Sequence, residues 1–421
     1  MTRKFGTDGV RGKAGTALTA ELAYTLGLAA ATALTTPGEQ RPTIVIGKDT
    51  RISGDMLEAA LAAGIAAAGV NVTLLGIIPT PGVAALMRIL NADAGAVISA
   101  SHNPYYDNGI KFFSRGGYKL PDSMENAIET MLKTPDTISR ATGAHIGRIR
   151  SLENADQLYV DLLLQQQSPN LANMKIALDC ANGAASFLAP PLLQKLGAEV
   201  IVIGNHPDGI NINHACGSTH LKSLQKLVIN SHAHLGLAFD GDADRLLAVD
   251  ERGQEIDGDF LLAIITAYLK EKQLLAKNRV VVTQMSNLGF KLAMEKLGVI
   301  VEETKVGDRY VLERMQETGA TAGGEQSGHL ILSHYNSTGD GPAAALKLLT
   351  IITESGQSLS QLSQVMERLP QVLVNVQVSR KTGWQDEQAI VERLDIDKAI
   401  RASRQQLAFL HGSVLQRRAV H

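Results

Sequence analysis

The chain reads Leu235-Gly-Leu-Ala-Phe-Asp-Gly-Asp-Ala-Asp-Arg-Leu-Leu-Ala-Val249 at the point that decides its fold and its chemistry. The two ends of this stretch are apolar and predict strands, so the acidic centre is a strand-to-strand connection. Alternate carboxylates separated by small residues can converge on one hard divalent cation, because Mg²⁺ prefers oxygen ligands at short range. We therefore predict that Asp240, Asp242 and Asp244 hold one Mg²⁺ per chain. A solvated acidic turn or a calcium loop is the competing interpretation.

A second motif places a hydroxyl at the end of another predicted strand. The chain reads Ala96-Val-Ile-Ser-Ala-Ser-His-Asn-Pro104, followed by Asp107-Asn-Gly-Ile-Lys111. The Asn-Pro step must leave the strand path, which puts Ser101 on a strand-end loop, where catalytic groups commonly collect. Taken alone, Ser101 and His102 are weak evidence, since neighbouring side chains on an extended chain point apart. For an isolated pair, a turn hydroxyl and a solvated imidazole are the simpler explanation.

The composition is that of a globular protein without a broad nucleic-acid surface. The 421 residues are 45% hydrophobic, 19% charged and 4% aromatic, with a formal net charge of −2. Any anionic ligand must then be bound by locally placed Arg, Lys and backbone N–H groups. Cys180 and Cys216 fit no zinc or redox spacing. No signal-peptide pattern follows Met1, and apolar runs such as Leu261 to Leu269 are too short to span a bilayer, so we expect a cytoplasmic location and no membrane partner. None of these signals indicates the oligomeric state.

Strand and helix signals alternate along the chain, which is typical of an α/β protein with largely parallel sheets. The predicted strands span 43–46, 71–75, 94–99, 175–179, 199–203, 279–283, 300–304 and 373–378. The predicted helices span 54–68, 187–196, 260–275, 288–297, 397–410 and a stretch from 341, with Ser53 placed to cap the first of them. We predict three consecutive mixed-sheet βαβ-type domains around a shared cleft plus an incomplete fourth α+β domain, at 1–150, 151–255, 256–368 and 369–421.

Five motifs occur in one order, and together they resemble the signatures of the α-D-phosphohexomutase family. They are Phe5-Gly-Thr-Asp-Gly-Val-Arg-Gly12, the segment from Ile98 to Lys111, the Asp-Gly-Asp-Ala-Asp-Arg run at 240–245, Val306-Gly-Asp-Arg-Tyr310 and Gly324-Glu-Gln-Ser-Gly-His329. The similarity is greatest to members that act on glucosamine phosphates. It implies an isomerase, an intramolecular phosphotransferase that interconverts glucosamine 6-phosphate and glucosamine 1-phosphate for peptidoglycan precursor synthesis in amino sugar metabolism.

The resemblance implies that Ser101 carries a phosphoryl group, passes it to a hydroxyl of the small-molecule sugar phosphate, and takes another back from the resulting 1,6-bisphosphate. One Mg²⁺ would be held by Ser101, through its phosphoryl group, together with Asp240, Asp242 and Asp244. Glucose or glucosamine 1,6-bisphosphate would then act as an activator. In chain order, the resemblance implies that the four predicted domains are a phosphoserine domain, a metal-binding domain, a sugar-binding domain and a truncated phosphate-binding domain.

The remaining site residues are expectations from the same resemblance. Lys111 and His329 are expected to accept and donate protons, while Arg11 and His102 orient the phosphoserine. The substrate-binding residues are expected to be Glu325, Ser327, Asp308, Arg309 and Arg245.

The end of the sequence departs from the family pattern. Members of the family grip the non-reacting phosphate with an Arg-x-Ser-Gly-Thr-Glu-Pro loop, whereas this chain continues past Arg417 to His421 without it. Since a hydrogen bond to a charged group contributes about 1.5–3 kcal/mol, we expect weaker substrate capture and slower turnover. The alternatives are a phosphoglucomutase or phosphomannomutase, a phosphoserine-dependent sugar phosphatase, and an inactive remnant.

Overall fold

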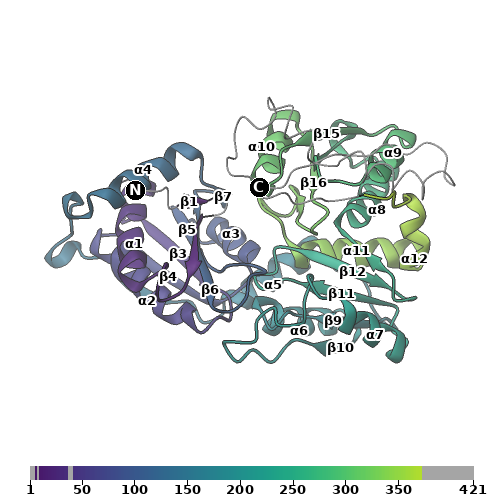
Figure 1. The fold of residues 1–421 in the computed structure, drawn as a ribbon, viewed down its shortest axis with the longest axis horizontal. Coiled ribbons are helices and arrows are strands. Elements are labelled where there is room, and N and C mark those ends of the chain that lie inside the picture. The colour runs from purple at the N-terminus through teal and green to yellow at the C-terminus, as the bar shows by residue number, and fades with distance from the viewer. Residues whose placement is uncertain (1–4, 7–8, 37–40, 372–421) are drawn as a thin grey trace, which may run out of the picture.

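The computed structural model describes residues 5–6, 9–36 and 41–371 as three α/β bodies arranged around a common centre (Figure 1). The first body is purple to blue, the second teal and the third green. The expected strand 373–378, the expected helix 397–410, Arg417 and nearly all of the expected fourth domain lie outside the described residues.

The first body is built on an eight-stranded sheet with the order β1-β2-β6-β5-β3-β4-β8, and β7 pairs with β6. Its strands are β1 (Phe5–Gly6), β2 (Gly9–Lys13), β3 (Thr43–Lys48), β4 (Asn71–Ile77), β5 (Ala94–Ile98), β6 (Asp107–Ser114), β7 (Tyr118–Lys119) and β8 (Ile149–Ser151). Its helices are α1 (Ala20–Leu34), α2 (Ser53–Ala67), α3 (Thr80–Ile89) and α4 (Asp122–Lys133), with short 3₁₀ turns at Pro135–Thr137 and Gly143–His145.

Two glycines allow α1 and α2 to pack at very short range. A Cβ on Gly27 would lie 2.3 Å from the carbonyl oxygen of Leu61, and one on Gly64 would lie 2.0 Å from that of Tyr24. Because real Cβ atoms do not approach a backbone that closely, these two positions require glycine. α2 also packs against β3, and it begins directly after the short loop that follows β3.

The second body has the sheet order β10-β9-β11-β12-β13. Its strands are β9 (Lys175–Asp179), β10 (Glu199–Ile203), β11 (Leu235–Phe239), β12 (Leu246–Asp250) and β13 (Glu255–Ile256). Its helices are α5 (Ala155–Gln166), α6 (Ala189–Lys195) and α7 (Lys222–Ser231), with a 3₁₀ turn at Ala184–Phe187. β11 is parallel to β9 but antiparallel to β12, with Phe239 opposite Leu246, so the acidic run forms the tight connection between β11 and β12.

The third body has the sheet order β15-β14-β16-β17. Its strands are β14 (Arg279–Thr283), β15 (Ile300–Thr304), β16 (Ala322–Gly324) and β17 (Leu330–Leu332). Its helices are α8 (Gly258–Glu271), α9 (Leu288–Lys296), α10 (Asp308–Thr318), α11 (Gly341–Ser355) and α12 (Leu359–Leu362), with 3₁₀ turns at Ala276–Asn278 and Ser363–Val365. One hydrophobic core cluster includes Val45, Leu237 and Val282, so it joins the three bodies.

The expected α/β class with three mixed sheets is confirmed, and four expected strands, 175–179, 199–203, 279–283 and 300–304, match residue for residue. The expected cap is wrong, because Ser53 is already the first residue of α2 and its hydroxyl accepts a hydrogen bond from Asn108 Nδ2. Among the helices that the structure describes, none combines the length and apolar character needed to cross a bilayer.

Candidate active site

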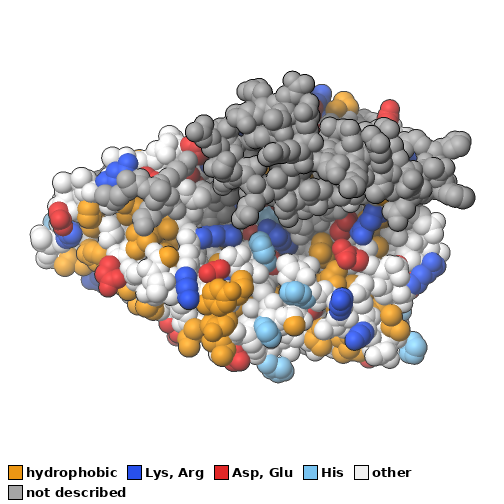
Figure 2. Space-filling model, in the orientation of Figure 1, with side chains coloured by type: hydrophobic (Ala, Val, Ile, Leu, Met, Phe, Trp, Pro, Cys, Tyr) orange, Lys and Arg blue, Asp and Glu red, His pale blue; other side chains and the backbone are white. Residues whose placement is uncertain are grey.

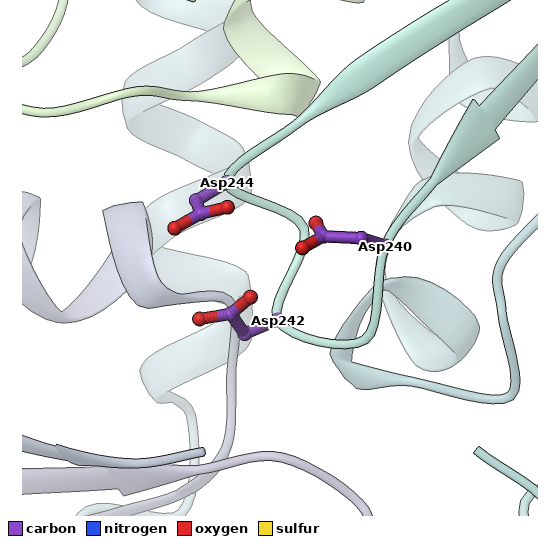
Figure 3. Close-up of side chains that lie close together, drawn as sticks. All are labelled: Asp240, Asp242 and Asp244. Atoms are coloured by element: carbon purple, nitrogen blue, oxygen red, sulfur yellow. The ribbon is translucent and has the colours of Figure 1, made fainter. Parts of the chain in front are cut away.

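The three aspartates of the β11–β12 loop turn their carboxylates toward one another (Figure 3). Asp240, Asp242 and Asp244 are all buried, and each offers an oxygen within 4.8 Å of the others. The acidic loop can approach Ser101 this closely because Gly241 has no Cβ. A Cβ at this position would lie 2.5 Å from the carbonyl oxygen of Ser101. The structure therefore brings the acidic loop and the expected phosphoserine into direct contact.

The donor set fits a divalent cation. Oδ1 of Asp242 and Oδ1 of Asp244 are buried and accept no hydrogen bond from any residue that the structure describes. Burial, followed by the charges of Asp244 and Asp242, raises the pKa of Asp240 well above its ordinary value. Buried carboxylates that repel one another and leave oxygens unbonded are what Mg²⁺ would neutralise.

Ser101 lies in the loop between β5 and β6, with its backbone in the left-handed region at φ 51°. Its Oγ donates a hydrogen bond to Asp240 Oδ2 at 2.5 Å, and it lies 3.5 Å from His102 Nδ1. Burial, then the nearby Arg245 and Arg11 charges, lowers the pKa of His102 to about 4. The imidazole beside Ser101 is therefore neutral at physiological pH.

Lys111 projects from β6 into the acidic cluster. Its Nζ donates to Asp242 Oδ2 at 2.9 Å and lies 3.7 Å from Asp244 Oδ2. Asp242 Oδ2 also accepts a hydrogen bond from Thr80 Oγ1 at 2.6 Å, a contact for which the sequence carried no signal. Although burial opposes ionisation, Lys111 and His329 lower the pKa of Asp244.

His329, the residue before β17, lies between two carboxylates. Its Nε2 is 3.1 Å from Asp308 Oδ2 and 3.6 Å from Asp244 Oδ2. Burial alone would disfavour the charged ring, but these carboxylates raise the pKa of His329 to about 10. Gly339 packs against the ring, and a Cβ there would lie 2.3 Å from its Cε1 atom.

A cavity of about 520 Å³ connects these groups. The expected site residues that line it are Arg11, Ser101, Asp244, Arg245, Asp308, Arg309, Glu325 and His329. The lining does not include Asp240, Asp242, Lys111, His102 or Ser327, although Ser327 Oγ lies 3.3 Å from Oε2 of the lining residue Glu325. Glu325 Oε1 accepts a hydrogen bond from the Gly307 N–H at 3.0 Å, which fixes the loop.

Ion pairs that the sequence did not indicate connect the first body to the third along this cavity. Lys119 Nζ lies 2.5 Å from Asp308 Oδ2, and Arg309 Nη1 lies 2.8 Å from Asp122 Oδ1. Asp308 and Arg309, expected to hold the substrate, therefore also hold the two bodies together. Figure 2 shows Lys and Arg side chains gathered near the middle of one face of the molecule.

The family comparisons agree with this geometry. The family described as Phosphoglucomutase/phosphomannomutase matches the chain with its alpha/beta/alpha domain I at residues 2–139, domain II at 157–253 and domain III at 257–369.

Curated relatives and solved structures point to the same family. The "Phosphoglucosamine mutase" of Desulforamulus reducens is 56% identical over 90% of this chain and 86% of its own length, and that of Carboxydothermus hydrogenoformans is 53% identical over 99% and 92%. A phosphoglucomutase/phosphomannomutase family protein from Burkholderia thailandensis superposes with a TM-score of 0.75 at 25% identity, covering 85% of this chain and 79% of that one.

A more distant neighbour shares the fold. The Aspergillus fumigatus N-acetylphosphoglucosamine mutase, solved with GlcNAc-6P and magnesium, superposes with a TM-score of 0.61 at 15% identity, over 90% of this chain and 82% of that one. The resemblance noted in the sequence is confirmed, and the chain belongs to the phosphoglucosamine mutases, isomerases of the phosphohexomutase superfamily.

Proposed function

We propose that this isomerase interconverts glucosamine 6-phosphate and glucosamine 1-phosphate with Ser101 as its phosphoryl carrier. The observation that carries the proposal is the 2.5 Å contact between Ser101 Oγ and Asp240 Oδ2 inside a buried carboxylate cluster. In the first half of the cycle the bond between phosphorus and the Ser101 oxygen breaks and a bond to a sugar hydroxyl oxygen forms, which gives the bisphosphate. In the second half the bond between the other phosphorus and its sugar oxygen breaks and a bond to the Ser101 oxygen forms again. In the first half the accepting sugar hydroxyl loses its proton and the Ser101 oxygen gains one, and in the second half Ser101 loses that proton and the departing sugar oxygen gains one.

We assign to His329 the donation of a proton to the sugar oxygen that departs in the second half, because it lines the cavity and is held in its charged form by Asp308 and Asp244. Lys111 donates a hydrogen bond to Asp242, where its charge offsets the carboxylates next to Ser101. Arg11 lines the cavity beside Ser101 and would orient the phosphoserine. His102, whose Nδ1 lies 3.5 Å from Ser101 Oγ, would do so as a neutral ring.

Asp240, Asp242, Asp244 and the phosphoryl group on Ser101 would hold one Mg²⁺, which supplies charge neutralisation for phosphoryl transfer when bound. The unbonded oxygens of Asp242 and Asp244 support this donor set. Glucose or glucosamine 1,6-bisphosphate would charge Ser101 and so activate the enzyme.

The substrate is a small sugar phosphate, and the cavity volume of about 520 Å³ suits a ligand of that size. Glu325 and Ser327 would contact the sugar hydroxyls, while Arg245, Asp308 and Arg309 would position the ring. The residues divide among functional units at 1–150, 151–255 and 256–368, so the substrate would be bound by all three. We place the reaction in the cytoplasm, as a step of amino sugar metabolism.

Intact-mass measurement of the purified enzyme tests the carrier role. We expect one added phosphoryl mass in the wild type, and its absence in Ser101→Ala. Ser114→Ala, which removes a hydroxyl at the far end of β6, is the matched control and should keep the mass and the activity. A fully active Ser101→Ala variant would end the proposal.

The same preparation separates the alternatives. Rates on glucosamine, glucose and mannose phosphates distinguish the amino sugar from the hydroxyl sugars, and we expect glucosamine phosphate to be preferred. Release of free phosphate at the rate of sugar phosphate consumption would instead indicate a phosphatase, in which water takes the place of the second sugar hydroxyl.

A further inference from the structure

One arginine outside the expected site holds the backbone of the Ser101 loop. Arg51 follows β3, its side chain is fully buried, and its guanidinium donates to carbonyl oxygens of the loop between β5 and β6. Nη1 donates to Pro104 O at 2.5 Å and Asp107 O at 3.1 Å, and Nη2 donates to Ser101 O and Asn103 O, both at 2.9 Å. A planar fork of fixed donors can satisfy four carbonyls at once, which a lysine ammonium cannot do in the same geometry.

The orientation of this guanidinium is itself fixed. Asp49 Oδ2 accepts from Arg51 Nε at 2.8 Å and from Ser99 Oγ at 2.6 Å. Ser99 Oγ in turn accepts the Ser101 backbone N–H at 2.9 Å. The backbone N–H and the carbonyl of Ser101 are therefore both held by one buried network centred on Asp49 and Arg51.

A second donor reaches the same carbonyls from the second body. Asn213 Nδ2 donates to Ser101 O at 2.8 Å and to Asn103 O at 3.1 Å. Asn213 has φ 58°, a left-handed conformation that asparagine tolerates better than most residues. Arg51 and Asn213 thus donate to the same two carbonyls, and each belongs to a different sheet body.

The hydrogen bonds from Arg51 and Asn213 matter because they hold Ser101 in an unfavourable backbone conformation. Ser101 has φ 51°, which is unfavourable for a residue with a Cβ and persists only where surrounding contacts hold it. In this conformation its Oγ meets Asp240, which lies in the same second body as Asn213. A small rotation of the Ser101 backbone would move the oxygen away from the carboxylates.

We infer that Arg51 and Asn213 are positioning residues that hold Ser101 Oγ at the acidic loop during phosphoryl transfer. Neither touches the reacting atoms, since each acts through the carbonyl of Ser101. The inference rests on the proposed carrier role of Ser101. It adds that residues of two different bodies together fix the position of the Ser101 oxygen. Displacement of a reacting atom by about 1 Å can cost a factor of about 100 in rate, so this positioning is worth testing kinetically.

The first test replaces Arg51 with lysine, which keeps the positive charge beside Asp49 and loses the planar fork. Enzyme that carries a radiolabelled phosphoryl group on Ser101 is mixed with glucosamine 1-phosphate, and movement of the label from the protein to the sugar is followed in a single turnover by rapid quenching. We expect Arg51→Lys to transfer about 10- to 100-fold more slowly than the wild type with an unchanged KM.

The second test uses a variant that leaves the Asp49–Arg51 pair intact. Asn213→Gly suits φ 58° and removes only the side-chain donor, so folding is preserved and slower transfer is expected. Asn182→Gly is the matched control, because Asn182 also has a positive φ of 48° but its side chain bonds Asn211 O and the His206 N–H instead of the Ser101 loop. It should transfer at the wild-type rate.

The outcomes are distinguishable. Slow transfer in Arg51→Lys and Asn213→Gly, with normal transfer in Asn182→Gly, supports the inference. Wild-type transfer rates in both test variants, or lowered thermal stability with unchanged transfer at a temperature where all variants are folded, would overturn it and leave the carrier role standing. A wild-type enzyme that never carries phosphate on Ser101 would overturn both.

Discussion

Ser101 Oγ lies 2.5 Å from Asp240 Oδ2, although the two residues are 139 positions apart in the sequence. The contact exists because the loop after β5 in the first sheet meets the loop after β11 in the second. Next to this contact the Thr80 N–H of the first body donates a hydrogen bond to Asp242 O of the second body at 2.9 Å. The proposed phosphoryl carrier from one body and an acidic cluster from another therefore lie in direct contact.

Removing one carboxylate from the cluster should abolish the stabilisation by Mg²⁺. For a ligand present at 100 times its Kd, binding to the folded state adds about 2.7 kcal/mol, and Asp240→Asn should lose most of this because a charged donor is gone. In EDTA the variant should be no less stable than the wild type, since like-charge repulsion is relieved. Thermal unfolding with and without Mg²⁺ measures both effects.

Asp250→Asn is the control for this experiment. Asp250 is a buried carboxylate on β12 that accepts the N–H groups of Arg252 and Gln254, and it lies outside the cluster. Its substitution should leave the Mg²⁺ response intact. An equal Mg²⁺ response in Asp240→Asn would contradict the metal assignment.

The buried carboxyl of Asp259 should make stability fall as pH rises. Burial raises the pKa of Asp259 from 3.8 to about 7, so between these values the unfolded chain is ionised while the folded chain stays protonated. The contribution of Asp259 to the free energy of unfolding is fully present below pH 3.8. It is lost as pH rises through about 7, at roughly 1.4 kcal/mol per pH unit at most.

Asp259→Asn should remove this dependence, because an amide keeps the bond from the Asn287 N–H without titrating. The free energy of unfolding of the variant relative to the wild type should therefore rise across that window. Urea denaturation at several pH values measures the difference, with the exposed Glu255→Gln as the control. A constant difference between variant and wild type would refute the assignment.

A methyl group at Gly339 should displace His329. The added Cβ would lie 2.3 to 2.6 Å from three atoms of the imidazole, which is closer than a carbon can approach. We expect Gly339→Ala to lower kcat by about 100-fold, the order seen when a catalytic group moves by about 1 Å. The comparison is Gly54→Ala, where the nearest atom is 3.4 Å away and helix propensity favours alanine, so kcat should not change.

The two ion pairs across the cavity should differ in strength. The Asp122 side chain in the Arg309–Asp122 pair is 67% exposed, so a double-mutant cycle of Asp122→Asn and Arg309→Gln should give about 0.2–1 kcal/mol, declining at high salt. The Lys119–Asp308 pair is 14% and 15% exposed, and its coupling should be larger and less sensitive to salt. Urea denaturation of the single and double variants at low and high NaCl gives the coupling energy of each ion pair. An equal salt dependence of the two coupling energies would contradict the prediction.

The sequence predicted strands most accurately where they are short, apolar and bounded by polar turns. The strand 175–179 was predicted to the residue because a fully buried parallel strand is apolar on both faces. The helix cap was predicted less well, since Ser53 bonds Asn108, a partner 55 residues away. Local patterns carry no information on such a contact.

The same limit applies within the site. Ser101 and the three aspartates could be proposed from their motifs, whereas Asn213 and Thr80 could not, because each bonds a residue of another segment. Asp49 and Arg51 follow the end of β3, so the rule that functional loops follow parallel strands could have drawn attention to them.

By itself, the sequence determined the alternation of strands and helices, the family motifs and the identity of the acidic loop, because these depend on neighbouring residues and their periodicity. Only the tertiary structure decided that Asp240 faces Ser101, that Asp308 pairs with Lys119 and His329, and that Arg51 and Asn213 share two carbonyls. The physical reason is that these contacts follow from how three sheet bodies pack, and packing depends on side chains that are far apart along the chain.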